Sequence, residues 1–168
     1  HAVSKDPAMV IYLDSAQNRK DKPNENFARE VMELFTLGEG HYSEADIREA
    51  ARAFTGWSID RDTGTFKFRP FIHDNGTKTV LGRSGNFDGD AVLDILLANR
   101  ATSEFIVAKM WREFVAPEPD AAEIRRIADA FHRSRHDVKS ALRGLFLSRA
   151  FWAEANRAAL IKSPVDLV

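Results

Sequence analysis

The stretch PNENFAREVMELFTLGEGHYSEADIREAARAFTGW, residues 23–57, decides the fold of this chain. At about 100° per residue, the apolar side chains of its first half fall on one broad arc of a helix. Asn24 or Asn26 can cap the start of this helix, and Gly38 can end it. The pattern predicts a helix whose buried face consists of Phe27, Ala28, Val31, Met32, Leu34 and Phe35.

The second half of the stretch predicts another helix, from about Glu44 to Thr55. Ser43, followed three residues later by Asp46, resembles a capping box, and Gly56 supplies the stop. The short connection GEGHY makes the two helices an αα-hairpin.

The polar side of the first helix carries Asn26, Arg29, Glu30 and Glu33. Two carboxylates at i, i+3 project the same way, so they can hold a cation or transfer protons. The alternative is a surface ladder in which Arg29 pairs with Glu25 and Glu33 at i, i+4 spacing. The residue types alone leave both interpretations open.

After Trp57 the helical period gives way to two-residue alternation, as in TFKFRPF. We expect a β-hairpin or an extended excursion at about residues 58–81. Further helices are expected in NFDGDAVLDILLANR, capped near Asp88, and over residues 102–115, 120–134 and 137–152. The predicted fold is therefore mainly α, a multi-helix orthogonal bundle with one hairpin, in a single domain over residues 1–168.

The stretch FIHDNGTK, residues 71–78, is a second candidate site. His73 beside Asp74, with Lys78 close behind, can supply a metal ligand, a general base or an anion clamp. The alternative is a turn, because Asp-Asn-Gly has strong turn chemistry. Trp57, straight after a helix end, is placed to wall a pocket, whereas Trp111 and Trp152 are expected in the core.

Composition narrows the function classes. A formal net charge of -1 gives no basic footprint for nucleic acid or an anionic membrane. No apolar run approaches the roughly 18–20 residues of a membrane span, so none is expected. The glycines have neither of the phosphate-loop spacings, so no nucleotide is expected. There is no cysteine, which excludes thiolate zinc sites and cysteine nucleophiles.

Several separated stretches resemble, in order, the pattern of a bacterial family known as domain of unknown function 1800. They are DPAMVIYLD, the stretch 23–57 quoted above, FIHDNGTKTVLG, ATSEFIVAKMWREFV and KSPVDLV. The interior of the HDNGTK turn differs from the proline-containing versions but keeps its His, Asp and Lys. The pattern maps onto Asn24, Glu25, Asn26, Ala28, Arg29, Glu30, Glu33, Leu34, Gly38, Tyr42, Asp46, Arg52, Thr55, Gly56, Trp57, His73, Asp74, Lys78, Leu81 and Gly82.

The resemblance implies a mostly helical part of a larger protein that is exported to the periplasm or beyond. The chain begins at His1 and stops after a possible helix start, so we expect a C-terminal fragment. Its missing N-terminal half is then one expected partner. An apolar patch which that half would cover can drive dimerisation of the fragment.

Two functions stay open, and we favour the first. The first is a helical module that binds another protein or a surface polymer, with its polar motifs fixing loops, for instance through a buried network joining Arg29 to the His73 turn. The second is a metal-assisted hydrolase with a divalent metal as cofactor. Its candidate ligands or acid–base groups are Glu30, Glu33, His73 and Asp74, and the candidate binding residues are Asn24, Asn26, Arg29, Trp57 and Lys78.

Overall fold

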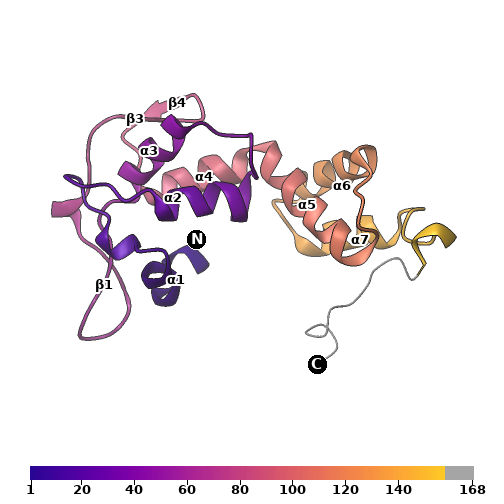
Figure 1. The fold of residues 1–168 in the computed structure, drawn as a ribbon, viewed down its shortest axis with the longest axis horizontal. Helices are drawn as coiled ribbons and strands as arrows, with labels where there is room; N and C mark the ends of the chain where they lie inside the picture. The colour runs from indigo at the N-terminus through magenta and orange to yellow at the C-terminus, as the bar shows by residue number, and fades with distance from the viewer. Residues whose placement is uncertain (158–168) are drawn as a thin grey trace. The chain divides into compact units, whose positions relative to one another are not determined.

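The computed structural model describes residues 1–157, which divide into two compact units (Figure 1). The first unit spans His1–Asn99, and the second begins at Arg100. In the described part of the chain helices predominate and the strands form two small antiparallel pairs, which confirms the mainly α fold. The segment KSPVDLV lies outside the described residues. Within residues 1–157, no helix is both long and apolar enough to cross a membrane.

The helices and strands of each unit follow the chain in a simple order. The first unit contains η1 (Val3–Lys5), α1 (Pro7–Tyr12), η2 (Ser15–Gln17), α2 (Asn26–Glu30), η3 (Val31–Thr36), α3 (Glu44–Ala53), β1 (Trp57–Ile59), β2 (Phe66–Phe68), η4 (Pro70–Ile72), β3 (Lys78–Val80), β4 (Arg83–Gly85) and α4 (Gly89–Ala98). The second contains α5 (Arg100–Phe114), α6 (Ala121–Arg133), α7 (Val138–Phe146) and η5 (Glu154–Asn156).

The first predicted helix is real but irregular. It starts as α2 and continues as η3, a π-helix in which the Leu37 N–H donates to the Met32 carbonyl at 2.8 Å. An i→i+5 turn is wider than an α turn, so the 100° spacing fails from Val31 onward. Leu34 and Phe35, predicted to be buried, are therefore 47% and 46% exposed, and Leu37 is buried instead.

The second predicted helix is α3, and its capping box is confirmed. The Ser43 hydroxyl accepts from the Asp46 N–H at 3.2 Å, while the Asp46 carboxylate accepts from the Ser43 N–H at 2.9 Å. Asp88 likewise caps α4 by accepting from the Ala91 N–H at 2.9 Å. These ends are fixed by residue pairs close in sequence, which is why the sequence predicts them well.

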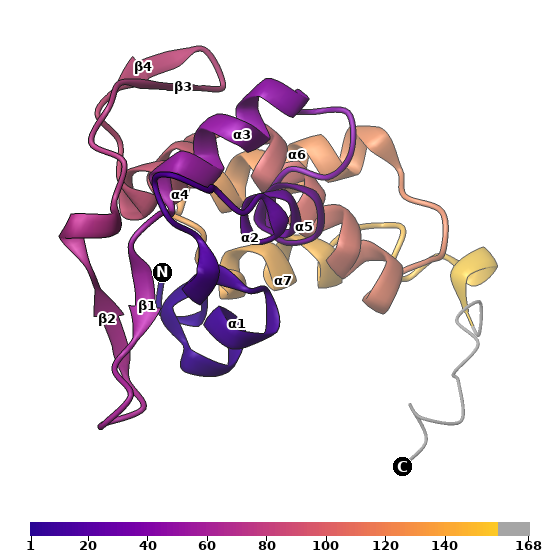
Figure 2. The ribbon, with the colours of Figure 1, turned by 60° about the vertical axis from the view of Figure 1, so that its left-hand side comes forward.

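The β-hairpin expected at about residues 58–81 is present, and a second hairpin follows it. β1 pairs antiparallel with β2, with Trp57 opposite Phe68, and β3 pairs with β4. The second hairpin turns through Leu81 and Gly82 at φ values of 49° and 75°, and a leucine gives no hairpin turn signal. Figure 2 shows β3 beside α3 and β1 beside α1.

The core of the first unit is aromatic. Phe27 and Phe54 pack edge to face with ring centroids 4.8 Å apart, and Trp57 lies 5.6 Å and 5.1 Å from them. Trp57 is only 2% exposed, so this candidate binding residue is a core side chain. Gly89 lies against its indole, where a Cβ would come within 2.4 Å of the ring.

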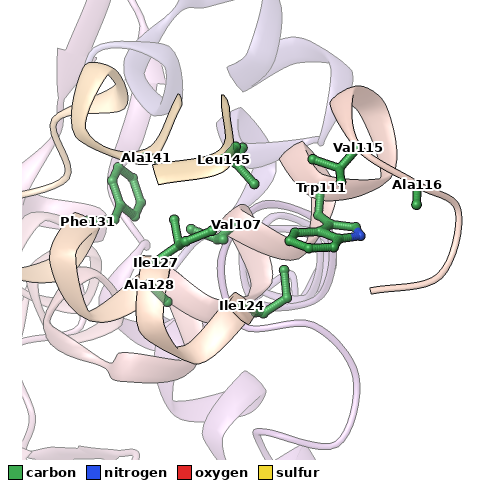
Figure 3. Close-up of a cluster of buried hydrophobic side chains, with 10 residues drawn as sticks. All are labelled: Val107, Trp111, Val115, Ala116, Ile124, Ile127, Ala128, Phe131, Ala141 and Leu145. Atoms are coloured by element: carbon green, nitrogen blue, oxygen red, sulfur yellow. The ribbon is translucent and has the colours of Figure 1, made fainter. Parts of the chain in front are cut away.

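The second unit has a core of its own, formed between α5, α6 and α7 (Figure 3). Trp111 is buried there, as predicted, and its indole N–H donates to the Glu118 carbonyl at 3.0 Å. The prediction for Trp152 is wrong, because this side chain is 76% exposed. The buried cluster consists of Val107, Trp111, Val115, Ala116, Ile124, Ile127, Ala128, Phe131, Ala141 and Leu145.

Candidate functional site

One stripe of polar side chains on α3 faces the segment that contains His73, Asp74 and Lys78. The stripe runs at three-residue spacing through Asp46, Glu49 and Arg52, and α3 packs against β3. Residues three apart on a helix lie on one side of it, so these side chains reach the same segment. We call α3 and residues 72–79, which run from the end of η4 into the start of β3, the α3–loop network.

Arg52 is the centre of the α3–loop network. Its Nε and Nη2 donate to the two Asp74 carboxylate oxygens at 2.7 and 3.2 Å, a fork that matches a carboxylate well. Its Nη1 donates to Glu49 at 2.9 Å and to the Thr77 carbonyl at 3.2 Å. The bonds from Arg52 hold the pKa of the Asp74 carboxyl below its ordinary value, against the opposing effect of burial.

His73 is 6% exposed and is held by Thr55, two residues after the end of α3. Its Nδ1 lies 2.8 Å from the Thr55 carbonyl oxygen, so Nδ1 carries the proton and donates. The Thr55 hydroxyl in turn accepts from the Asp74 N–H at 2.8 Å. His73 and Asp74 are therefore fixed by backbone and hydroxyl partners, with the Phe68 ring edge-on to the imidazole at 5.3 Å.

Lys78 is completely buried and closes the loop from inside. Its ammonium donates to the carbonyls of Asp74 and Gly76 and, at 3.4 Å, to Asn86 Oδ1. Burial lowers the pKa of Lys78, and the neighbouring Asp74 acts in the opposite direction. All three N–H groups of the ammonium are directed at protein oxygens. Lys78, the candidate anion clamp, is therefore a structural ammonium in this conformation.

The carboxylates of α3 also bind backbone N–H groups of the second hairpin. Glu49 accepts from the Thr79 N–H at 3.0 Å, and Asp46 accepts from the Leu81 N–H at 2.7 Å. These bonds satisfy groups on β3 and its turn that would otherwise need water or another strand. The stripe on α3 therefore fixes the loop and the hairpin together.

The polar stripe on α2 and η3 makes different contacts. Arg29 binds Glu44 with two bonds of 2.9 and 2.8 Å and reaches Glu25 at 3.4 Å. Glu33 accepts from the Tyr42 hydroxyl at 3.0 Å. Burial, and to a lesser extent this bond, raises the pKa of Tyr42 to about 12. The predicted network around the His73 turn exists, but Arg52 takes the place expected of Arg29.

The candidate asparagines shape the chain before α2. Asn24 Oδ1 accepts from the Asn26 N–H at 3.0 Å, which satisfies one of the free donors at the start of the helix. The Asn24 N–H donates to the buried Asn18 side chain at 2.9 Å. Both contacts are local turn contacts.

The hydrolase candidates are not brought into one group. The contacts of His73 and Asp74 are with Thr55 and Arg52, whereas Glu33 is bonded to Tyr42. Over residues 1–157, no three or more His, Asp or Glu side chains lie close enough together to hold a metal ion. The described geometry therefore supplies no ready site for a divalent cation.

Sequence reasoning missed Glu49 and Asn18. Asn18 is buried and donates from its amide to the Ala51 carbonyl at 2.8 Å, which ties the loop before α2 to α3. Nothing local marks this role, since its partner is distant in sequence. For Glu49 a signal existed, namely the three-residue spacing that it shares with Asp46 and Arg52.

Comparison with known proteins gives one finding. The family model described as "Protein of unknown function (DUF1800)" matches residues 1–168, which is the whole chain. Searches of the curated proteins and of the solved structures found no match. The chain therefore belongs to the DUF1800 family, as its motifs indicated.

Proposed function

We propose that this chain is a helical module that binds another protein through an apolar pocket of its first unit. The single observation that carries the proposal is the pocket itself. It has a volume of about 180 Å³ and opens between η1, α1, η3 and α4. Its lining consists of His1, Val3, Ser4, Met9, Phe27, Val31, Phe35, Thr36, Leu93 and Leu97.

The size and lining of the pocket favour a protein side chain as occupant. Sites for small molecules usually measure roughly 300–1,000 Å³, so this one is small for a cofactor. A cavity of this size suits one or two large apolar side chains, the anchors that dominate protein interfaces. A polysaccharide offers mostly hydroxyl groups, so an apolar lining favours a protein over a surface polymer.

Exposed apolar side chains at the pocket extend the surface available to a partner. Val3 is 67% exposed and Phe35 is 46% exposed. Phe35 reaches the surface because the π-helix turns it away from the aromatic core. An N-terminal portion of the same protein, expected from the family resemblance, is one source of a segment that binds here.

The polar residues of the α3–loop network are also consistent with a binding module. His73, Asp74 and Lys78 bond to α3 and to the backbone of their own loop, so they hold structure in place. In a binding module such a network keeps the fold rigid, which reduces the entropy lost on association.

The test uses an amphipathic helical peptide with Leu at i, i+3, i+4 and i+7, labelled for fluorescence anisotropy. A peptide of the same composition in scrambled order is its control. We expect Phe35→Ser to weaken binding of the peptide roughly tenfold or more, because a large apolar side chain is lost from the rim of the pocket. The matched control is Phe114→Ser, which changes a 43% exposed phenylalanine of the second unit.

NMR of the methyl groups of Val31, Leu93 and Leu97 locates the binding. Shifts at these methyl groups, lost in Phe35→Ser and kept in Phe114→Ser, support the proposal. Equal binding of the scrambled peptide, equal loss in both variants, or no binding at all would overturn it. Self-association of the free chain that competes with the peptide identifies a second copy, in place of another protein, as the occupant.

A further inference from the structure

A second pocket in the first unit is lined by three arginines and lies apart from the apolar pocket. Its volume is about 430 Å³, and Arg19, Arg61 and Arg69 line it from three different stretches of chain. Arg19 follows η2, Arg61 lies in the turn between β1 and β2, and Arg69 follows β2. The remaining lining residues are Ala16, Ser58, Ile59, Phe71 and Ile72.

The stretches that carry these arginines are tied together by backbone bonds. The Lys20 N–H donates to the Ile72 carbonyl at 2.9 Å, which fixes the loop next to Arg19 against η4. The Gly56 N–H donates to the Asn18 carbonyl at 3.3 Å, which fixes the same loop to the start of β1. The convergence of the arginines is thus built into the fold.

Arg69 is the best fixed of the three. It is half-buried, and its Nε and Nη2 donate to Ser58 Oγ at 3.1 Å and to the Ile59 carbonyl at 3.4 Å. A guanidinium has five N–H groups, so others remain to meet a ligand. An arginine oriented in this way has already lost part of its conformational freedom before a ligand arrives.

The three arginines form no ion pair with any acidic side chain of the described residues. Among residues 1–157, no carboxylate lies within 4.0 Å of a guanidinium nitrogen of Arg19, Arg61 or Arg69. Asp60, in the same turn as Arg61, is bound by Lys67 at 2.6 Å. Like charges around one hollow repel each other, and an oxyanion bound between them removes that repulsion.

The rest of the pocket fits a ligand with an apolar or planar body. Phe71, Ile59 and Ile72 supply apolar surface beside the arginines. The volume falls within the range of small-molecule sites, unlike that of the apolar pocket. Arginine forks bind carboxylates and phosphates through paired N–H bonds.

We propose that the pocket formed by Arg19, Arg61 and Arg69 binds a small oxyanion, a phosphate ester or a carboxylate that carries an apolar or planar group. This site is separate from the proposed protein-binding pocket, so either proposal can fail alone.

The test is calorimetric titration of the purified chain with inorganic phosphate, phenyl phosphate and benzoate at low ionic strength. We expect phenyl phosphate or benzoate to bind more tightly than inorganic phosphate, because only these reach the apolar wall. Arg19→Gln and Arg61→Gln change exposed side chains, so the fold should survive. Each should weaken binding roughly tenfold or more.

Arg83→Gln is the matched control, because Arg83 is an exposed arginine of the same unit outside the pocket. Arg69→Lys keeps the charge but loses the fork, and it should also weaken binding. Preference for phenyl phosphate identifies a phosphate ester, and preference for benzoate identifies a carboxylate. Failure of all three ligands to bind, or equal weakening by Arg83→Gln, would overturn the proposal.

Discussion

Arg52 shows how much one side chain can fix. Its guanidinium joins a carboxylate of its own helix, a carboxylate of the loop before β3 and a carbonyl of that loop. Its side chain is 28% exposed, and that of its partner Asp74 is 19% exposed, so solvent weakens the pair only in part. The position of the His73 turn therefore depends on a residue more than twenty positions away.

Arg52→Gln is expected to lower the free energy of unfolding by about 1.5–3 kcal/mol at neutral pH, since bonds to a charged group are lost. The pKa of Asp74 is lowered in the folded chain, so its contribution is fully present above the unfolded pKa of about 3.9 and is lost as pH falls from there through the lower folded pKa. Urea denaturation of both proteins at neutral pH and at about pH 3 measures this, and the difference should shrink in acid.

The control is Arg29→Gln, whose partner Glu44 has a side chain 62% exposed. Exposed ion pairs contribute about 0–1 kcal/mol to the free energy of unfolding, so Arg29→Gln should lower it less than Arg52→Gln does. Equal losses in the two variants, or an Arg52 effect that does not depend on pH, would contradict the role given to Asp74.

Among the elements, the caps were predictable and the irregular segments were not. The capping box at Ser43 and the cap at Asp88 depend on residues a few positions apart. The π-helix after α2 and the β3–β4 turn through Leu81 carry no such local signal, since their geometry depends on packing with the rest of the unit. For the same reason the sequence identified the His73 turn but could not choose Arg52 over Arg29.

Gly56 shows why the turn between α3 and β1 needs a glycine. Its φ is +90°, and an added Cβ would come within 2.9 Å of the Phe68 ring and 3.0 Å of the Arg69 carbonyl. Gly56→Ala should therefore lower the free energy of unfolding by two contributions. The backbone strain accounts for about 1–2 kcal/mol, and the clash with the ring and the carbonyl adds about 1–3 kcal/mol.

Gly64→Ala separates these two costs. Gly64 has φ +67° but nothing within 4 Å of an added Cβ, so only the backbone strain is expected. Urea denaturation of the two variants gives the comparison. Equal destabilisation would mean that the packing around Gly56 yields to a methyl group.

At the scale of the whole chain, each unit has its own core. Phe54 belongs to the aromatic cluster of the first unit, and Ile127 belongs to the buried cluster of the second. The sequence correctly indicated a mainly α fold and the family, because composition and motifs report these directly. The single domain remains a prediction.

Amide hydrogen exchange tests how far the two cores act together. Phe54→Ala and Ile127→Ala should each lower the free energy of unfolding by about 2–5 kcal/mol, because each leaves a cavity in its core. We expect faster exchange in α3 for Phe54→Ala and in α6 and α7 for Ile127→Ala, since each cavity lies within one core. If either substitution speeds exchange equally in both units, the chain unfolds as a single cooperative domain.

The complete burial of Lys78 has a consequence for its chemistry. A lysine is acylated only when its amine is neutral and can be reached by the reagent. The lowered pKa of Lys78 favours the neutral form, while the surrounding loop blocks the approach. Opening of the loop would remove the burial that lowers this pKa, so the exposed amine would react as an ordinary surface lysine. Acylation of Lys78 therefore reports opening of the loop, and covalent capture of the amine would hold the loop open.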